Sequence, residues 1–258
     1  MRFSVALAVA FSTTALRAGI PPLLDESWTT YVKEFDHWAY TETTRAFDAT
    51  GKQTRETVTR YDPSLPYAEQ FTILSHNGKP PTPEQVKQSR QRGIFRGERL
   101  EKPGGLENDT QPRLILHGSP ALADLEHATV VEETTQSVTY AVPMRAEGRN
   151  GFPVEKFVTH VRVSKTERAF EHVEIRLAEA VRMKLIAKMH VLDFSIDFTA
   201  VDPKFTRAAT LMKDHAVVSV FFRRQEGGHE SARGDFKRVT PYRDRFGVKI
   251  GPMRTIDF

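Results

Sequence analysis

The side chains best suited to acid–base or metal chemistry are nine histidines, which are spread along the whole chain. No His-Glu-x-x-His or His-x-His motif occurs, so no sequence signature of a zinc site is present. His172 and Glu174 share one face of a predicted strand, as do His160 and Arg162, and neighbouring strands could bring these pairs together. A solvated polar face is the simpler interpretation. We expect no catalytic residue, no metal and no cofactor.

Other short motifs give equally little support for an enzyme. Ser119 follows a glycine but lacks the Gly-x-Ser-x-Gly pattern of a hydrolase nucleophile, and no Gly-x-Gly-x-x-Gly or Walker A loop is present. Asp193 and Asp197 share a predicted strand face, which is typical of a wet surface, and His190 and Asp193 straddle a predicted bulge. An envelope hydrolase that uses scattered histidines and aspartates is therefore the least favoured of three functional hypotheses.

The N-terminus and the absence of cysteine both indicate export. Arg2 precedes an apolar run, and small residues follow at Ala15 and Ala18, which predicts a signal peptide over residues 1–18. A buried N-terminal helix is the alternative. The chain has no cysteine, which excludes disulfides, thiolate zinc sites and a lipidated cysteine. Because exported eukaryotic domains usually carry disulfides, we expect a Gram-negative periplasmic protein that is soluble or peripherally membrane-associated.

Basic residues gather with aromatic residues in the last quarter of the chain. The net charge of +4 and the pI near 9.3 are too modest for a nucleic-acid binder. Basic and aromatic side chains together suit an anionic membrane surface, while a solubilising charged edge is the alternative interpretation. The residues assigned to this predicted surface are Arg223, Arg224, Lys237, Arg238, Arg243 and Arg245.

The elements that must position these side chains are mostly strands. Apolar and polar residues alternate from Val154 to Phe222, and a period of two places them on opposite faces of a sheet. The short connections favour antiparallel pairing, so we predict a curved sheet with one apolar face. The residues predicted to line a ligand cavity on that face are Phe157, Val161, Val173, Ile175, Leu177, Leu185, Phe194, Ile196, Phe198, Val220 and Phe222.

The remaining segments predict further strands and a few helices. A helix over 25–35 should precede a hairpin of two strands, 37–47 and 53–61, that turns at Gly51. Thr82 and Gln85 form a capping-box pattern for a polar helix over 83–91, which we expect to end at Gly93. We predict a covering flap over 98–120, one or two helical turns over 205–212, a flexible hairpin turn over 225–234, and final strands through Phe236 and the C-terminus. Residues 19–258 are expected to form one domain.

The order of these features resembles a known family. An aromatic strand with Trp38-Ala39-Tyr40, a hairpin into Arg60-Tyr61-Asp62-Pro63, and Asn77-Gly78-Lys79 before a proline-capped polar helix are similar to the periplasmic lipoprotein-localisation superfamily, the LolA/LolB-like half-barrels. The resemblance covers most of the chain as a pattern. It implies a mainly β fold, an incomplete antiparallel barrel with covering helices, and an apolar cavity able to hold acyl chains. It assigns no individual acyl-binding residue, and the missing cysteine argues against a membrane-anchored receptor.

These observations lead to one functional hypothesis and a runner-up. We expect a non-enzymatic, monomeric carrier that holds a lipid or the acyl chains of an acylated protein. Apolar burial alone contributes about 0.8 kcal/mol per methylene, so such a ligand needs no specific polar contact. The runner-up is an assembly factor of the outer membrane with a filled core and a protein partner.

Overall fold

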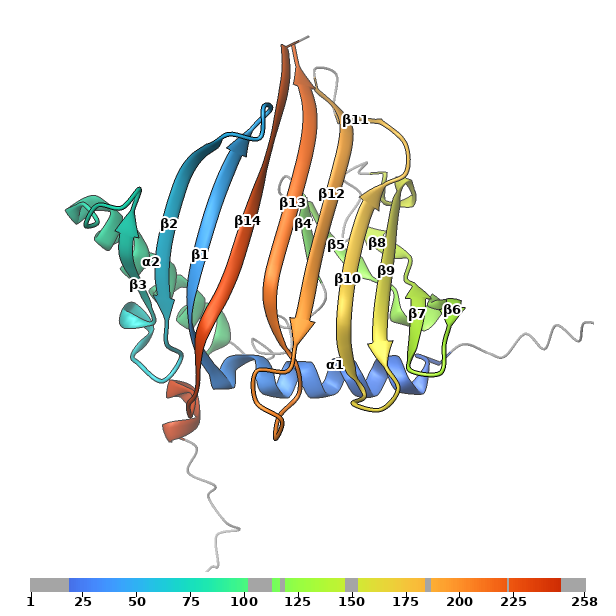
Figure 1. Cartoon of the computed structure of the whole chain (residues 1–258), viewed down its shortest axis with the longest axis horizontal. Helices are drawn as coiled ribbons and strands as arrows, with labels where there is room; N and C mark the ends of the chain where they lie inside the picture. Colours follow the sequence, from blue (N-terminus) through green and yellow to red (C-terminus); the bar gives the residue numbers. More distant parts are fainter. Residues whose placement is uncertain are drawn as a thin grey trace, which may run out of the picture.

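The computed structural model describes residues 19–101, 113–116, 119–146, 153–183, 187–221 and 223–246, and its main feature is one large antiparallel sheet (Figure 1). The sheet has eleven strands and is not closed into a barrel, which is consistent with the expected incomplete barrel. In spatial order its path is β3 (Phe71–His76), β2 (Gln53–Tyr61), β1 (Trp38–Asp48), β14 (Arg223–Arg238), β13 (Ala208–Val220), β12 (Ala187–Thr199), β10 (Ala169–Leu177), β9 (Phe157–Ser164), β7 (Ser137–Ala141) and β6 (Thr129–Glu133), with β11 (Val181–Met183) paired to β12.

The first hairpin forms where the sequence predicts it. Strands β1 and β2 are antiparallel and pair Tyr40 with Tyr61. Gly51 has a φ of 79°, which a residue with a side chain rarely adopts. The Asp48 carboxylate accepts hydrogen bonds from the backbone N–H groups of Thr50 and Lys52, at 2.9 and 3.1 Å, and so closes the turn. The hairpin therefore follows from local turn chemistry.

The central strands confirm the predicted alternation and the predicted bulge. In β9, Phe157, Val161 and Val163 are buried, whereas Val158 between them is exposed. The register of β12 against β13 shifts between Met189 and Val191. Because a bulge inserts one extra residue into the strand, it moves the apolar set from odd-numbered to even-numbered positions. The apolar face thus stays continuous along the strand.

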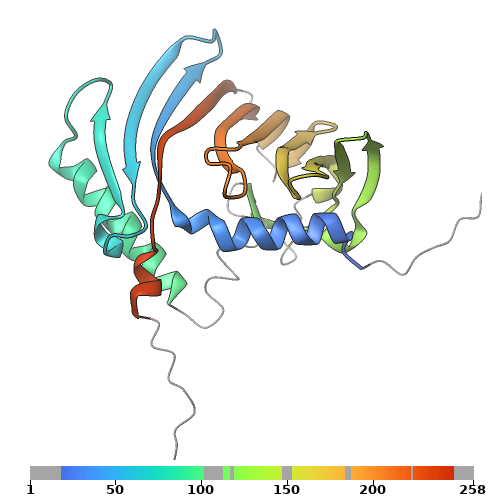
Figure 2. The same ribbon diagram turned by 60° about the horizontal axis from the view of Figure 1, so that its bottom comes forward.

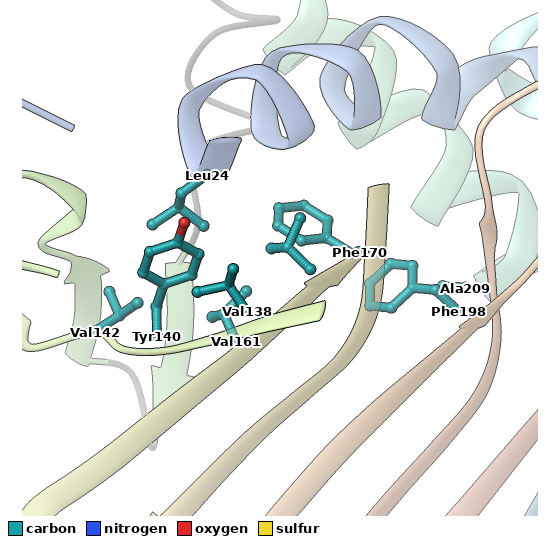
Figure 3. Packing of buried hydrophobic residues seen from close by; sticks show 9 residues of the cluster. Leu24, Val138, Tyr140, Val142, Val161, Phe170, Phe198 and Ala209 are labelled. Atoms are coloured by element: carbon teal, nitrogen blue, oxygen red, sulfur yellow. The ribbon is translucent and has the colours of Figure 1, made fainter. Parts of the chain in front are cut away.

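Helix α1 (Pro22–Glu34) crosses the concave side of this sheet (Figure 2), and its side chains pack in one core cluster with residues of β7, β9, β10, β12 and β13. It begins before the predicted Asp25, because Pro22 occupies its first turn, and Leu24 is completely buried. Trp28 and Tyr31 of the predicted apolar stripe contact the ring of Phe170 at centroid distances of 5.9 and 5.8 Å. Figure 3 shows the resulting cluster, in which Leu24 points from the helix toward the strands.

A second core cluster lies on the same sheet and contains no residue of α1. It is formed by Phe157, Ile175, Val181, Met189 and Leu192. Met144 packs against it from β8 (Met144–Ala146), which belongs to a three-stranded sheet with β4 (Arg113–Leu116) and β5 (Ser119–Ala123). These strands stand where the covering flap over 98–120 was predicted; residues 102–112 and 117–118 lie outside the described ranges.

Helix α2 (Pro83–Leu100) packs along strand β3 and the short 3₁₀ turn Tyr67–Glu69. Its predicted N-terminus is confirmed, since Thr82 and Gln85 form the reciprocal hydrogen bonds of a capping box. The predicted end at Gly93 is wrong. A Cβ on Gly93 would lie 1.8 Å from the Tyr67 carbonyl oxygen, and one on Gly97 would lie 2.4 Å from the Tyr67 ring. Both glycines therefore allow close packing inside the helix rather than ending it.

Two predictions near the C-terminus are also wrong. Residues 205–212 contain no helix, because β13 begins at Ala208, and residues 225–234 lie inside the continuous strand β14. The turn between these strands comes earlier, at Phe221, whose φ is 47°. A Cβ on Gly228 would lie 2.4 Å from the Asp214 carbonyl oxygen, so this glycine permits close strand contact and is not a turn residue.

Other predictions concern residues outside the described ranges. These are the signal peptide over 1–18 and the last strand after Phe246.

The described end of the chain differs from the predicted strand. Residues Tyr242–Phe246, predicted to be part of a strand, form a 3₁₀ helix. Within the described ranges, no helix combines the length and the apolar character that a membrane span requires.

Candidate ligand cavity

A cavity of about 350 Å³ lies on the concave face of the main sheet, between the C-terminal end of α1 and helix α2. Its size is within the range of roughly 300–1,000 Å³ that is usual for small-molecule sites. The residues that line it come from both helices, from the 3₁₀ turn after α1, from five strands and from the loop before β13. They are Tyr31, Glu34, Phe35, Trp38, Tyr40, Tyr61, Phe71, Arg92, Arg96, Arg99, Thr206, Arg207, Ala208, Ala209, Arg233 and Phe236.

The sheet side of the cavity is a row of aromatic rings that crosses four adjacent strands. Consecutive ring centroids along Trp38, Phe236, Tyr40, Tyr61 and Phe71 are 6.1, 5.8, 5.1 and 4.9 Å apart. The antiparallel register places these positions side by side on the concave face. Such contacts stabilise the row beyond simple area burial, by about 0.5–1.5 kcal/mol per pair. The row therefore forms a continuous aromatic wall of rings that are tilted against one another.

The helix side of the cavity consists of arginines that lie over this wall. The Arg92 guanidinium lies 4.2 Å from the centroid of the Phe71 ring, and that of Arg96 lies 5.6 Å from the Tyr61 ring. From the sheet itself, the Arg233 guanidinium lies 4.5 Å from the Tyr40 ring. A cation over an aromatic face is attracted by the negative charge density of the ring. The cavity is thus lined by aromatic faces and by guanidinium groups.

Asp36 anchors the arginine side through a buried polar cluster. It is 2% exposed and accepts hydrogen bonds from the Tyr61 hydroxyl and from Arg96 Nη2, both at 2.7 Å. Arg243 approaches the other carboxylate oxygen at 3.3 Å, and Arg96 also donates to Gln70 Oε1 at 3.2 Å. Burial and the nearby Asp36 charge raise the pKa of Tyr61, so its hydroxyl stays neutral. The cluster fixes α2 against the sheet.

Two further lining arginines are neutralised by carboxylates. Arg233 Nε donates to Glu42 Oε2 at 2.8 Å on the concave face. Arg207 makes a two-pronged contact with Glu167, at 2.7 and 2.8 Å. A guanidinium and a carboxylate in this geometry form a strong charge-assisted pair. These contacts hold the two side chains in position at the cavity wall.

Sequence reasoning placed the cavity elsewhere on the same face. None of the predicted cavity residues that the structure describes lines the observed cavity. Val161, Val173, Ile196 and Phe198 belong to the cluster beneath α1, and Phe157, Ile175, Leu177 and Phe194 to the second core cluster. Val220 lies at the far end of β13, and Leu185 and Phe222 are outside the described ranges. Eight of the nine predicted cavity residues that the structure describes thus belong to the packed core clusters.

The arginines of α2 were missed because the helix appeared uniformly polar. Arg92, Arg96 and Arg99 are spaced i, i+4 and i+7, which places them on one helix face. That spacing was the available signal. The aromatic row had no comparable signal, since its members are separated by up to 198 positions between Trp38 and Phe236.

The predicted basic surface is divided between two ends of strand β14. Arg223 and Arg224 are exposed at the β13–β14 turn, beside Phe221. Lys237 and Arg238 lie at the opposite end, roughly 45 Å away at about 3.3 Å per strand residue. Arg238 forms an ion pair with Glu34, and Arg243 pairs with Asp36. The Arg245 side chain is outside the described part, so the structure does not bring the six residues together.

The outer face of the sheet carries the histidines considered for catalysis. His172 Nδ1 lies 2.6 Å from Asp197 Oδ1 and its Nε2 lies 3.8 Å from Glu174, in a second, shallower hollow of about 570 Å³. Ser195 lines the same hollow, but no hydrogen bond joins it to a histidine within the described ranges. Among the described residues, no group of three or more metal-ligating side chains was found. The arrangement is a cross-strand network of ion pairs.

Comparison of the chain with protein-family models, with curated proteins and with solved structures gave no significant match.

Proposed function

We propose that this protein is a non-enzymatic, periplasmic binding protein that holds one acyl chain of a lipid or of an acylated protein in the cavity between α1, α2 and the aromatic row. The observation that carries the proposal is the aromatic row itself, which presents a continuous apolar wall to a cavity of ligand size. A chain that leaves water for this wall gains about 0.8 kcal/mol per buried methylene.

The size of the cavity favours one chain over several. At about 350 Å³ it is near the lower end of the usual range for small-molecule sites, roughly 300–1,000 Å³. The same cavity favours the carrier over an assembly factor, for which a filled concave face was expected. For a hydrolase, the described residues offer His172 beside Asp197 and, separately, His190 at 2.9 Å from the Ser219 hydroxyl, and no hydrogen bond among these residues joins the two pairs into a triad.

The direct test is to purify the full chain from its native host and to analyse a solvent extract by mass spectrometry. We expect an acyl lipid in near-stoichiometric amount. Thr206 lines the cavity, so Thr206→Phe should fill it and remove the lipid. Thr199 is exposed on β12, so Thr199→Phe is a matched control that should retain it. Protein that carries no lipid and binds no added acyl ligand would refute the proposal.

A further inference from the structure

The polar groups around the cavity are strongly biased toward positive charge. Five arginines line it, against a single acidic side chain, Glu34. Glu34 itself is paired with Arg238, outside the lining set. The acids that neutralise Arg96, Arg207 and Arg233, which are Asp36, Glu167 and Glu42, are not among the residues that line the cavity. A ligand in this space therefore meets mainly cations and hydrogen-bond donors.

Arg92 differs from the neutralised arginines of the wall. Its guanidinium lies on the Phe71 ring, at 4.2 Å from the centroid, and no acidic side chain of the described residues forms an ion pair with it. The side chain is exposed on α2, so its charge is solvated in the empty cavity. A guanidinium that is held on a ring and still has its donors available is suited to pair a carboxylate.

Three further donors at the cavity also lack a protein acceptor. Trp38 is 5% exposed, and its indole N–H is buried without a hydrogen-bond partner among the described residues. No described group accepts a hydrogen bond from the hydroxyls of Tyr31 or Tyr40. Burial raises the pKa of Tyr40 to about 12, so this hydroxyl remains a donor at neutral pH. The indole nitrogen is fully buried and does not face the cavity, whereas the hydroxyls of the two lining tyrosines are not fully buried and can donate to a ligand oxygen.

We infer that the cavity selects a single-chain amphiphile with one negative charge, a carboxylate at the end of an apolar chain, whose headgroup pairs with Arg92 at the Phe71 end of the aromatic row. The inference rests on the proposed function and adds the headgroup to it. The Arg92 guanidinium, which forms no ion pair among the described residues, matches one negative charge. A neutral chain would leave the Arg92 charge without an anionic partner.

The test compares two ligands that differ only in the headgroup. Dodecanoate and dodecanol are titrated into the full chain by calorimetry at about pH 8, where a carboxylate is ionised. We expect dodecanoate to bind at least tenfold more tightly. Arg92→Gln should lower dodecanoate affinity about tenfold and leave dodecanol affinity unchanged. Arg90→Gln is the matched control, because Arg90 is exposed on the same helix outside this cavity, and it should change neither affinity.

Each other outcome is informative. Equal affinity for the two ligands would overturn the charge selection and leave the proposed acyl carrier intact. Binding of neither ligand would overturn the proposed function itself. Equal losses in Arg92→Gln and Arg90→Gln would show a general charge effect and overturn the role of Arg92. Circular dichroism of each variant checks that the fold is retained, which the exposure of both side chains leads us to expect.

Discussion

The two halves of the concave face have similar walls but different covers. In one half, α1 inserts Leu24, Trp28 and Tyr31 against Phe170 and Phe198, and the space is filled. In the other half, α2 presents arginines to an equally aromatic wall, and a cavity of about 350 Å³ is left. A guanidinium is planar, remains charged and retains its hydrogen-bonding needs, so it cannot fill an apolar space as a leucine does. The helix that covers each half, not the sheet, therefore decides which half retains a cavity.

The largest effect should come from truncating matched aromatic rings in the two halves. Phe198 is 4% exposed in the filled half, so Phe198→Ala should cost about 3–5 kcal/mol of unfolding free energy. Phe236 borders the cavity, and Phe236→Ala should cost clearly less because fewer contacts are lost. Urea denaturation measures both values. Equal losses would mean that the two halves are packed alike.

Substitution of Asp36, which holds α2 beside the cavity, should lower the unfolding free energy by nearly as much. Asp36→Asn removes the charge that neutralises Arg96 and Arg243, and breaking a buried pair in this way costs about 3–5 kcal/mol. Tyr61→Phe removes only one hydrogen bond to Asp36 and should cost about 1 kcal/mol. If Asp36→Asn were no worse than Tyr61→Phe in thermal or chemical denaturation, the cluster would not hold α2 in place.

A smaller change in stability is expected at Gly93, and its direction shows whether the glycine is closely packed. In an exposed helix, glycine to alanine stabilises by about 1 kcal/mol. Here the new Cβ meets the Tyr67 carbonyl oxygen, so Gly93→Ala should instead destabilise by about 1–3 kcal/mol, the usual range for overpacking. Gln91→Ala on the exposed side of the same helix is the control and should be close to neutral. A stabilised Gly93→Ala would contradict the close packing of α2.

The smallest effect on stability is expected at the β13–β14 turn. Arg223→Glu with Arg224→Glu should change the unfolding free energy by less than about 0.5 kcal/mol, because both side chains are exposed. Flotation with vesicles that contain anionic lipid tests the proposed membrane contact, which the double variant should weaken. If the double variant floats with the vesicles as the wild type does, Arg223 and Arg224 only make this turn more soluble.

The sequence predicted what depends on near neighbours. Alternation, the Gly51 turn, the Thr82 capping box and the bulge near Met189 are local patterns, and all were confirmed. It failed where a residue acts through distant contacts. Glycines such as Gly93 and Gly228 are common in turns, so turns were predicted there. In the fold, each glycine instead lets a distant backbone segment pack closely against it. The apolar strand face was correct, but the sequence does not state which part of it a helix fills.

The most direct test of the central claim uses the two tryptophans, one in each half of the concave face. Trp28→Phe leaves Trp38 as the reporter of the hollow half, and Trp38→Phe leaves Trp28 as the reporter of the filled half. A dodecanoate brominated on its chain quenches fluorescence only at short range. We predict saturable quenching of Trp38 and little quenching of Trp28, with calorimetry confirming that both variants bind. Quenching of Trp28 alone, or of neither residue in variants that bind the chain, would contradict the account.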